Sequence, residues 1–186
     1  MTELYLVRHG ETDWSKSGRH TSVTDLDLTD TGVVDASALR DRLAGIDFGL
    51  ALTSPRLRAR RTAELAGFPD AEVEPDLAEW YYGDYEGRTS NAIRTDVSDW
   101  RIWTHPIPGG ESASEVLDRL TRVVTRVRDA DIDRALCFAH GHSLRVLAVA
   151  WLGLGVQHGA SFPLATGSVS ILGFEKESPA IIRWNS

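Results

Sequence analysis

The chain has 186 residues and a formal net charge of −7, from 27 acidic and 20 basic side chains. This acidic balance disfavours a general nucleic-acid binder, which needs a basic surface. The single cysteine, Cys137, excludes an intrachain disulfide framework and a cysteine-based zinc site. No stretch approaches the ~20 apolar residues of a membrane-spanning helix, and no basic region precedes an apolar one as in a signal peptide. We therefore expect one domain, residues 1–186, in the cytoplasm.

The first half of the chain alternates predicted strands with predicted helices. Short apolar runs predict buried strands, and apolar residues at helical spacing predict amphipathic helices. Thr29 and Ser54 each precede a predicted helix, where a hydroxyl can cap the free amides, and Pro55 suits a first helical position. In chain order we expect a strand over 4–7, a loop over 8–28, a helix over 30–43, a strand over 48–53, a helix over 55–66 and a strand over 71–74.

The second half begins with an irregular, aromatic stretch at 75–89. Ser112 and Glu115 form a capping-box signature, and the apolar residues after them give the clearest helix in the chain. Alternating strands and helices indicate an α/β fold, which we expect to be a three-layer α/β/α sandwich with a mostly parallel central sheet. The remaining predicted elements are a strand over 135–139, a helix over 143–152 and a pair of strands over 169–174 and 180–184.

Basic residues directly follow three of the predicted strands. They are Arg8-His9-Gly10, the segment 54–58 with Arg58, and His140-Gly141-His142. Ligand sites in open parallel sheets form beyond the carboxyl ends of strands, so these clusters should meet at one edge. Concentrated positive charge in an acidic protein calls for an anion, and the guanidinium fork of arginine matches phosphate oxygens.

These residue types suit the transfer of a phosphoryl group. A neutral histidine can attack phosphorus and form a phosphohistidine. The departing ester oxygen needs a proton, and Glu79 in the irregular stretch is available to donate it. An ion pair with one of the arginines is the alternative for Glu79. Two histidines at 140 and 142 could ligate a metal, but no third ligand stands at a suitable spacing, so we expect no metal and no cofactor.

Five segments carry a family resemblance. The first is Leu6-Val7-Arg8-His9-Gly10-Glu11-Thr12, and the others, in chain order, cover 53–63, 79–87, 108–112 and 139–142. This ordered series resembles the histidine phosphatase superfamily, the phosphoglycerate-mutase-like proteins.

The resemblance implies roles for individual side chains. His9 would be the nucleophile, and Glu79 would protonate the leaving oxygen and then activate water. The phosphoryl oxygens would be held by Arg8, Arg58 and His140. Contacts lining the pocket or touching the rest of the substrate would come from Thr12, Ser15, Thr21, Ser22, Tyr82, Gly141 and His142.

Within this family, hydrolysis has to be separated from phosphomutase activity. The mutases usually have asparagine where this chain has Ser15, and they carry an inserted segment with paired arginines, whereas residues 88–108 contain no such pair. Hydrolysis of a small phosphorylated metabolite is therefore favoured. The segments around Trp14 and Glu79 most resemble the branch of sedoheptulose-bisphosphatases and broad acid phosphatases, which suggests a sugar phosphate, with Arg19 or His20 on a distal phosphate.

Two rival hypotheses remain open. One is a phosphoglycerate-type mutase that uses the same His9, and the other is a catalytically silent module that binds a phosphorylated ligand. We expect no nucleic-acid or membrane partner, and nothing in the sequence supports a homo-oligomer.

Overall fold

The computed structural model describes all 186 residues and is built on a six-stranded sheet. The strands lie in the order β3-β2-β4-β1-β5-β6; the first four are parallel, and β5 and β6 each run antiparallel to the strand before them. The predicted α/β fold with a mostly parallel sheet is confirmed. The strands are β1 (Glu3–Arg8), β2 (Leu50–Thr53), β3 (Glu72–Val73), β4 (Arg134–Ala139), β5 (Val169–Glu175) and β6 (Ser178–Arg183).

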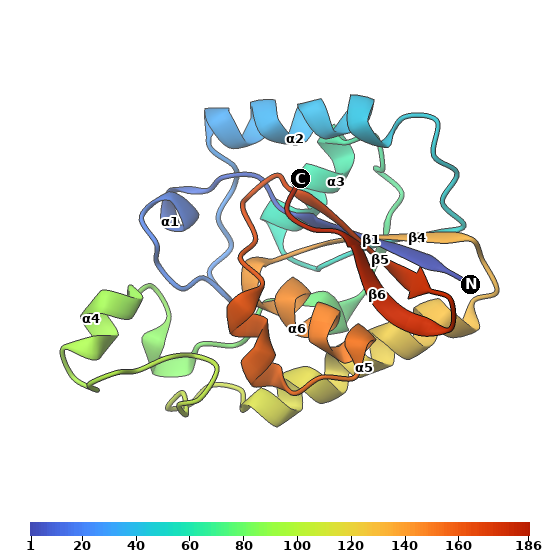
Figure 1. Cartoon of the computed structure of the whole chain (residues 1–186). Helices are drawn as coiled ribbons and strands as arrows, with labels where there is room; N and C mark the ends of the chain where they lie inside the picture. The colour runs from blue at the N-terminus through green and yellow to red at the C-terminus, as the bar shows by residue number, and fades with distance from the viewer.

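Helices cover both faces of this sheet, with α2 and α3 on one side and α5 and α6 on the other (Figure 1). The sandwich therefore has the three layers predicted from the alternation of elements. Two short helices, α1 and α4, lie away from these layers. The helices are α1 (Asp13–Lys16), α2 (Asp30–Leu43), α3 (Leu57–Leu65), α4 (Ser90–Arg94), α5 (Ala113–Asp129) and α6 (Gly141–Leu152), with 3₁₀ turns at Pro75–Leu77, Gly83–Tyr85 and Val156–Ser161.

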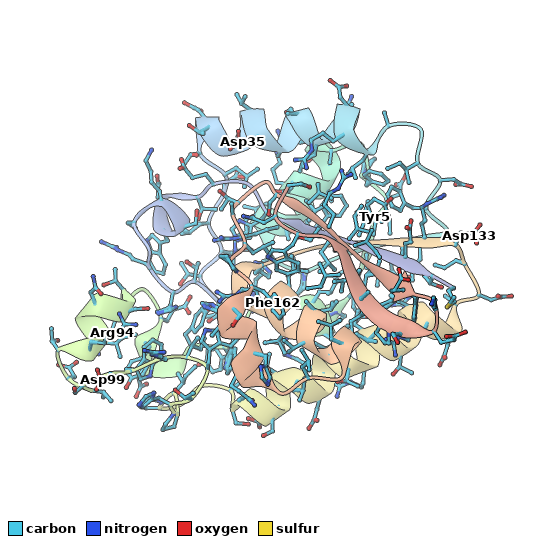
Figure 2. All side chains as sticks on the ribbon, viewed as in Figure 1. Tyr5, Asp35, Arg94, Asp99, Asp133 and Phe162 are labelled. Carbon is cyan, nitrogen blue, oxygen red and sulfur yellow. The ribbon has the colours of Figure 1, made fainter.

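The alternation of side chains along β1 divides the apolar interior between the two faces. Leu4 and Leu6 enter the larger core, under α5 and α6, whereas Val7 enters the smaller core, under α2 and α3. Tyr5 packs edge-to-face on Phe48 beside the smaller core; Figure 2 labels it on the sheet, and Asp35 on α2. The alternation of side chains along the strand thus determines which of the two cores each side chain enters.

Several predicted helix boundaries are confirmed by their hydrogen bonds. Thr29 caps α2 by accepting from the amide of Gly32 at 3.1 Å. Ser112 and Glu115 form the reciprocal capping box at the start of α5. Gly153 ends α6 in a left-handed conformation, with φ of 69°, as a glycine at a helix end does readily.

Two helix starts were predicted wrongly. Helix α3 begins at Leu57, not Pro55, because its first amide donates to the carboxylate of Asp25 at 2.7 Å. The hydroxyl of Ser54 accepts weakly from the amide of Arg56 at 3.3 Å and does not cap the helix in the predicted way. Helix α6 begins at Gly141, two residues before the predicted start.

The irregular segments contain more structure than predicted. The loop over 8–28 includes α1, which Thr12 and Ser15 close with a capping box of their own. Helix α4 is capped by Thr89, and it lies in a stretch without an apolar pattern. Both helices are too short to show the 3.6-residue repeat that reveals α2 and α5.

The parallel strands end together at one edge of the sheet. In Figure 1, β1 runs away from the labelled N-terminus, and α1 and α4 lie beyond its far end. This arrangement places the loops that follow β1, β2 and β4 beside one another.

No helix is both long enough and apolar enough to cross a membrane.

Candidate active site

The three basic clusters meet at the carboxyl ends of the parallel strands, as predicted. The amide of His9 donates to the carbonyl of Ala139 at 3.0 Å, and the amide of Ser54 donates to the carbonyl of Phe138 at 2.9 Å. The ring centroids of His9 and His140 lie 5.2 Å apart. Side chains from β1, β2 and β4 can therefore act on one ligand.

The backbone around His9 leaves one ring nitrogen free. Nδ1 lies 2.8 Å from the carbonyl oxygen of Gly10, so Nδ1 carries the proton and donates it. Nε2 then has an unshared lone pair. Burial, followed by the charges of Arg58 and Arg8, lowers the pKa of His9 well below its usual 6.5. The imidazole is therefore neutral at neutral pH, as a nucleophile requires.

The glycine after His9 is required by a close approach of two backbones. A Cβ atom on Gly10 would lie 2.5 Å from the carbonyl oxygen of Gly32 at the start of α2. The amide of Gly10 also donates to the hydroxyl of Thr62 on α3 at 3.1 Å. The His9 loop is thus pressed between two helices, and this contact fixes the position of the ring.

Arg58 and His140 form a buried array behind His9. Arg58 Nε donates to His140 Nδ1 at 3.2 Å, so His140 carries its proton on Nε2 and donates it to the hydroxyl of Ser54 at 2.7 Å. Both side chains have no solvent exposure. Burial and the charge of Arg58 lower the pKa of His140 well below 6.5, so this ring is also neutral.

The remaining nitrogens of Arg58 hold the loop after α1. They donate to the carbonyls of Thr21, Ser22 and Thr24, at 3.0, 3.4 and 3.1 Å. Glu86 holds the same loop from the other side, through the amides of Ser22 and Thr24 and the hydroxyl of Ser22. Glu86 was missed as a site residue, although it lies within the 79–87 segment that carried the resemblance.

Two residues predicted to touch the ligand lie elsewhere in this structure. The hydroxyl of Thr12 caps α1, and the hydroxyl of Ser22 bonds Glu86 and accepts from the amide of Tyr82. Neither residue lines the cavity next to His9. Their side chains instead shape the loop that surrounds it.

The carboxylate of Glu79 lies at the amino end of α6. It accepts hydrogen bonds from the amides of Trp80, His142 and Ser143, at 2.9, 3.0 and 2.8 Å. Free amides at a helix N-terminus are satisfied by a side-chain acceptor, and here these bonds fix the position of the carboxyl group. Glu79 makes no ion pair, so the alternative of an arginine partner does not describe it.

An ion pair that the sequence did not reveal holds the segment on both sides of Glu79. Arg119, on α5, donates two parallel hydrogen bonds to Glu111, at 2.8 and 3.0 Å. Its third nitrogen donates to the carbonyls of Asp76 and Ala78, and Glu111 accepts from the amide of Tyr81. The backbone before and after Glu79 is therefore tied to one buried guanidinium.

A cavity of about 430 Å³ opens beside His9. Arg8 and Glu79 line it, whereas Arg58 and His140 are buried behind it. Most of the predicted contact residues also line it: Ser15, Arg19, His20, Thr21, Tyr82, Gly141 and His142. The lining residues that the sequence analysis missed include Arg94, Arg101, Trp103 and Arg145.

Arg8 reaches the cavity because residue 141 is a glycine. A Cβ atom on Gly141 would lie 3.3 Å from the guanidinium carbon of Arg8, closer than side chains normally pack. One nitrogen of Arg8 donates to the carbonyl of Leu164, and its Nε is buried without a partner. An unused donor on a cavity-lining arginine suits an anionic ligand.

A cluster of aromatic side chains forms the wall next to Glu79. The hydroxyl of Tyr82 and Nδ1 of His142 are hydrogen bonded at 2.6 Å. The ring of His20 lies 4.7 Å from that of Tyr82, and Nε2 of His20 lies 3.2 Å from the hydroxyl of Ser90. Burial lowers the pKa of His20 to about 4 and holds that of His142 well below 6.5. Both rings are therefore neutral at neutral pH.

Comparison with known proteins adds to this geometry. Residues 4–186 match the sequence model of the family described as "Histidine phosphatase superfamily (branch 1)". The chain is 43% identical to an acid phosphatase of Mycobacterium tuberculosis, over 92% of this chain and 86% of the relative. It is 37% identical to the sedoheptulose 1,7-bisphosphatase of Saccharomyces cerevisiae, over 82% of this chain and 68% of the relative. The solved structure of an open reading frame from Mycobacterium tuberculosis superposes with a TM-score of 0.95 at 38% identity, covering 99% of this chain and 97% of that one.

Proposed function

The chain belongs to branch 1 of the histidine phosphatase superfamily and is a phosphatase, and we propose that it hydrolyses small phosphorylated metabolites through a phosphohistidine on His9, without a metal. The observation that carries this proposal is the hydrogen bond from Nδ1 of His9 to the carbonyl of Gly10. This bond holds the ring proton on Nδ1, which leaves the lone pair of Nε2 available to attack phosphorus.

The first step forms the phosphoenzyme. The lone pair of His9 Nε2 forms a bond to phosphorus, and the bond between phosphorus and the ester oxygen breaks. A proton from Glu79 passes to that oxygen, so the product leaves as a neutral alcohol. Two observations support this role for Glu79: the residue lines the same cavity, and three backbone amides hold its carboxyl group in place.

The second step returns the enzyme to its starting state. Glu79, now a carboxylate, accepts a proton from water while the water oxygen bonds to phosphorus. The bond between phosphorus and Nε2 breaks, and its electron pair returns to His9. Phosphate leaves, and Glu79 is again protonated for the next substrate.

The charge that develops on the transferring group is met by Arg8 and His140, while Arg58 acts from behind His9 through its positive charge and its hydrogen bond to His140. Arg8 lines the cavity and has an unused donor, and the His140 ring lies 5.2 Å from that of His9. Donors already in position stabilise such charge most effectively when burial excludes water. In this role the ring of His140 rotates, so that its Nε2–H group, which donates to Ser54 in this structure, donates to a phosphoryl oxygen.

For the substrate, we propose a sugar phosphate. The cavity combines neutral imidazoles, hydroxyls and aromatic rings, which suit a polyhydroxylated molecule. The name of one similar protein, a sedoheptulose 1,7-bisphosphatase, agrees with this class. Of the two residues suggested for a distal phosphate, Arg19 is charged, whereas His20, with a pKa of about 4, is neutral at neutral pH.

The test is phosphate release by the wild type and by His9→Ala from a panel of sugar monophosphates, bisphosphates and 3-phosphoglycerate, with EDTA present. The proposal predicts release that resists EDTA and disappears in His9→Ala. Transfer of radiolabelled phosphate to a second acid or sugar, with little release to water, would favour the mutase. Phosphate binding without turnover would favour the silent binding module.

A further inference from the structure

The guanidinium of Arg8 is oriented by the loop over 162–168, which leads from the last 3₁₀ turn into β5. One of its nitrogens donates to the carbonyl of Leu164, its Nε has no partner, and it makes no ion pair. The same loop also holds the backbone of Arg8, whose amide donates to the carbonyl of Ser168 at 3.2 Å and whose carbonyl accepts from the amide of Gly167 at 3.1 Å. The direction of this guanidinium therefore depends on the position of the loop.

Two side chains from outside this loop hold it in place. The loop contains neither helix nor strand, and Trp184 and Asn185, which directly follow β6, bind its backbone. Nε1 of Trp184 donates to the carbonyl of Pro163 at 2.6 Å, and Oδ1 of Asn185 accepts from the amide of Ala165 at 2.7 Å. The two bonded residues stand on either side of Leu164 in the chain. The carbonyl that binds the guanidinium is thus fixed from both directions.

Trp184 and Asn185 are themselves held by further contacts. The ring of Trp184 packs against that of Phe162, which Figure 2 labels, with the ring centroids 5.5 Å apart. The amide of Asn185 donates to the hydroxyl of Ser170 on β5 at 3.0 Å. The backbone of Asn185 is left-handed, with φ of 55°, a conformation that asparagine adopts more readily than most residues. Both side chains are therefore directed toward the loop.

We propose that Trp184 and Asn185 are positioning residues, which direct the free N–H groups of Arg8 at the transferring phosphoryl group. Neither residue lines the cavity next to His9, whereas Leu164 does, so their effect on the reaction passes through the loop. Groups that stabilise a transition state must be held within about 0.5 Å of the productive geometry. The bond to Leu164 is the one contact that orients this guanidinium. The proposal rests on the proposed function, in which Arg8 meets the charge on the transferring group.

The first test removes the two bonds and keeps the surrounding shape. Trp184→Phe retains a ring against Phe162 but loses Nε1–H, and Asn185→Gly retains the left-handed backbone but loses Oδ1. We expect the double variant to lower kcat/KM for p-nitrophenyl phosphate roughly tenfold, because a misdirected donor stabilises the transition state less. Lys176→Gly is the matched control, since Lys176 is exposed at the turn between β5 and β6 with φ of 54°. An unchanged double variant, or an equal fall in the control, overturns the proposal.

The second test separates positioning of Arg8 from a general loss of structure. If the two residues act through Arg8, their replacement should change kcat/KM by less than about twofold in an Arg8→Gln background. An equal fall in both backgrounds overturns the proposal. Asn185→Asp keeps an acceptor oxygen and should restore most of the activity that Asn185→Gly loses. Activity that stays low in Asn185→Asp contradicts the role of the bond to Ala165.

Binding of inorganic phosphate, measured by calorimetry on the same four proteins of the cycle, gives a readout that needs no turnover. The dissociation constant should rise when the two bonds are removed from the wild type, and should not rise further in the Arg8→Gln background. A wild type that does not hydrolyse p-nitrophenyl phosphate contradicts the proposed function, whereas the binding cycle still decides whether Trp184 and Asn185 act through Arg8. The two failures are therefore distinguishable.

Discussion

Arg119 and Glu111 are joined by two parallel hydrogen bonds at the back of the segment that carries Glu79, at 2.8 and 3.0 Å. Arg119 also donates to the carbonyls of Asp76 and Ala78, and Glu111 accepts from the amide of Tyr81. The pair therefore binds the backbone on both sides of Glu79. The side chain of Arg119 is only 9% exposed, so water does not compete effectively for these contacts. The position of Glu79 thus depends on two side chains that do not line the cavity next to His9.

Arg119→Lys tests this dependence. Lysine keeps the charge but lacks the planar fork that bonds Glu111 twice and two carbonyls as well. We expect kcat/KM for a sugar phosphate to fall roughly tenfold, and that for p-nitrophenyl phosphate to fall less, because only the poor leaving group depends on a well-placed acid. Arg122→Lys is the matched control, since Arg122 lies on the same helix and pairs with Asp76 at the surface. An equal fall on both substrates would assign Arg119 a purely structural role.

Glu79→Gln removes the proton donor and keeps the shape of the side chain. We expect the rate of phosphoenzyme formation from sugar phosphates to fall roughly 100-fold or more, because general acid catalysis contributes at that scale. The rate with p-nitrophenyl phosphate should fall much less. Rapid-quench measurements on both substrates provide the comparison, and Glu177→Gln, at an exposed turn, serves as the control. Equal losses on the two substrates would remove Glu79 from the acid role.

The buried histidines make stability depend on pH. Burial lowers the pKa of His9, His20, His140 and His142, whereas in the unfolded chain these rings take up protons near pH 6.5. The unfolded state therefore binds more protons below pH 6.5, and the free energy of unfolding falls as the pH decreases. For His20 this loss extends to about pH 4 and amounts to roughly 3 kcal/mol.

Urea unfolding between pH 7.5 and 4.5 measures this effect. We expect the free energy of unfolding to decrease throughout the range below pH 6.5. His20→Gln should make the decrease shallower, and His158→Gln, at an exposed position, should leave it unchanged. A free energy of unfolding that rises toward pH 5 would contradict the neutral, buried state of these rings.

The fold and the centre of the site were predictable from sequence because they depend on local pattern. Short apolar runs marked the strands, and the basic residues directly after them had to meet at one sheet edge. The capping box at Ser112 identified α5 for the same reason, since its two residues lie three positions apart. The family resemblance, drawn from motifs in order, is confirmed by the match over residues 4–186.

What escaped prediction depends on contacts between distant segments. Helix α3 starts where it does because of Asp25, which lies 32 positions before Leu57. Arg94 and Arg101 belong to a stretch without apolar periodicity, so nothing in the sequence placed them on the cavity wall. In the sequence, Arg119 is one of several arginines among the polar positions of α5. Only the structure reveals that it is buried against Glu111.

The most direct test of the central claim is to trap the phosphoenzyme. Wild type, Glu79→Gln and His9→Ala are mixed with substrate and quenched in base, in which phosphohistidine survives, and then analysed by intact-protein and peptide mass spectrometry. The account predicts that the wild type gains one phosphoryl group, located on His9, and that His9→Ala gains none. A phosphoryl group on His140 or His142, or turnover in His9→Ala at the wild-type rate, would contradict it.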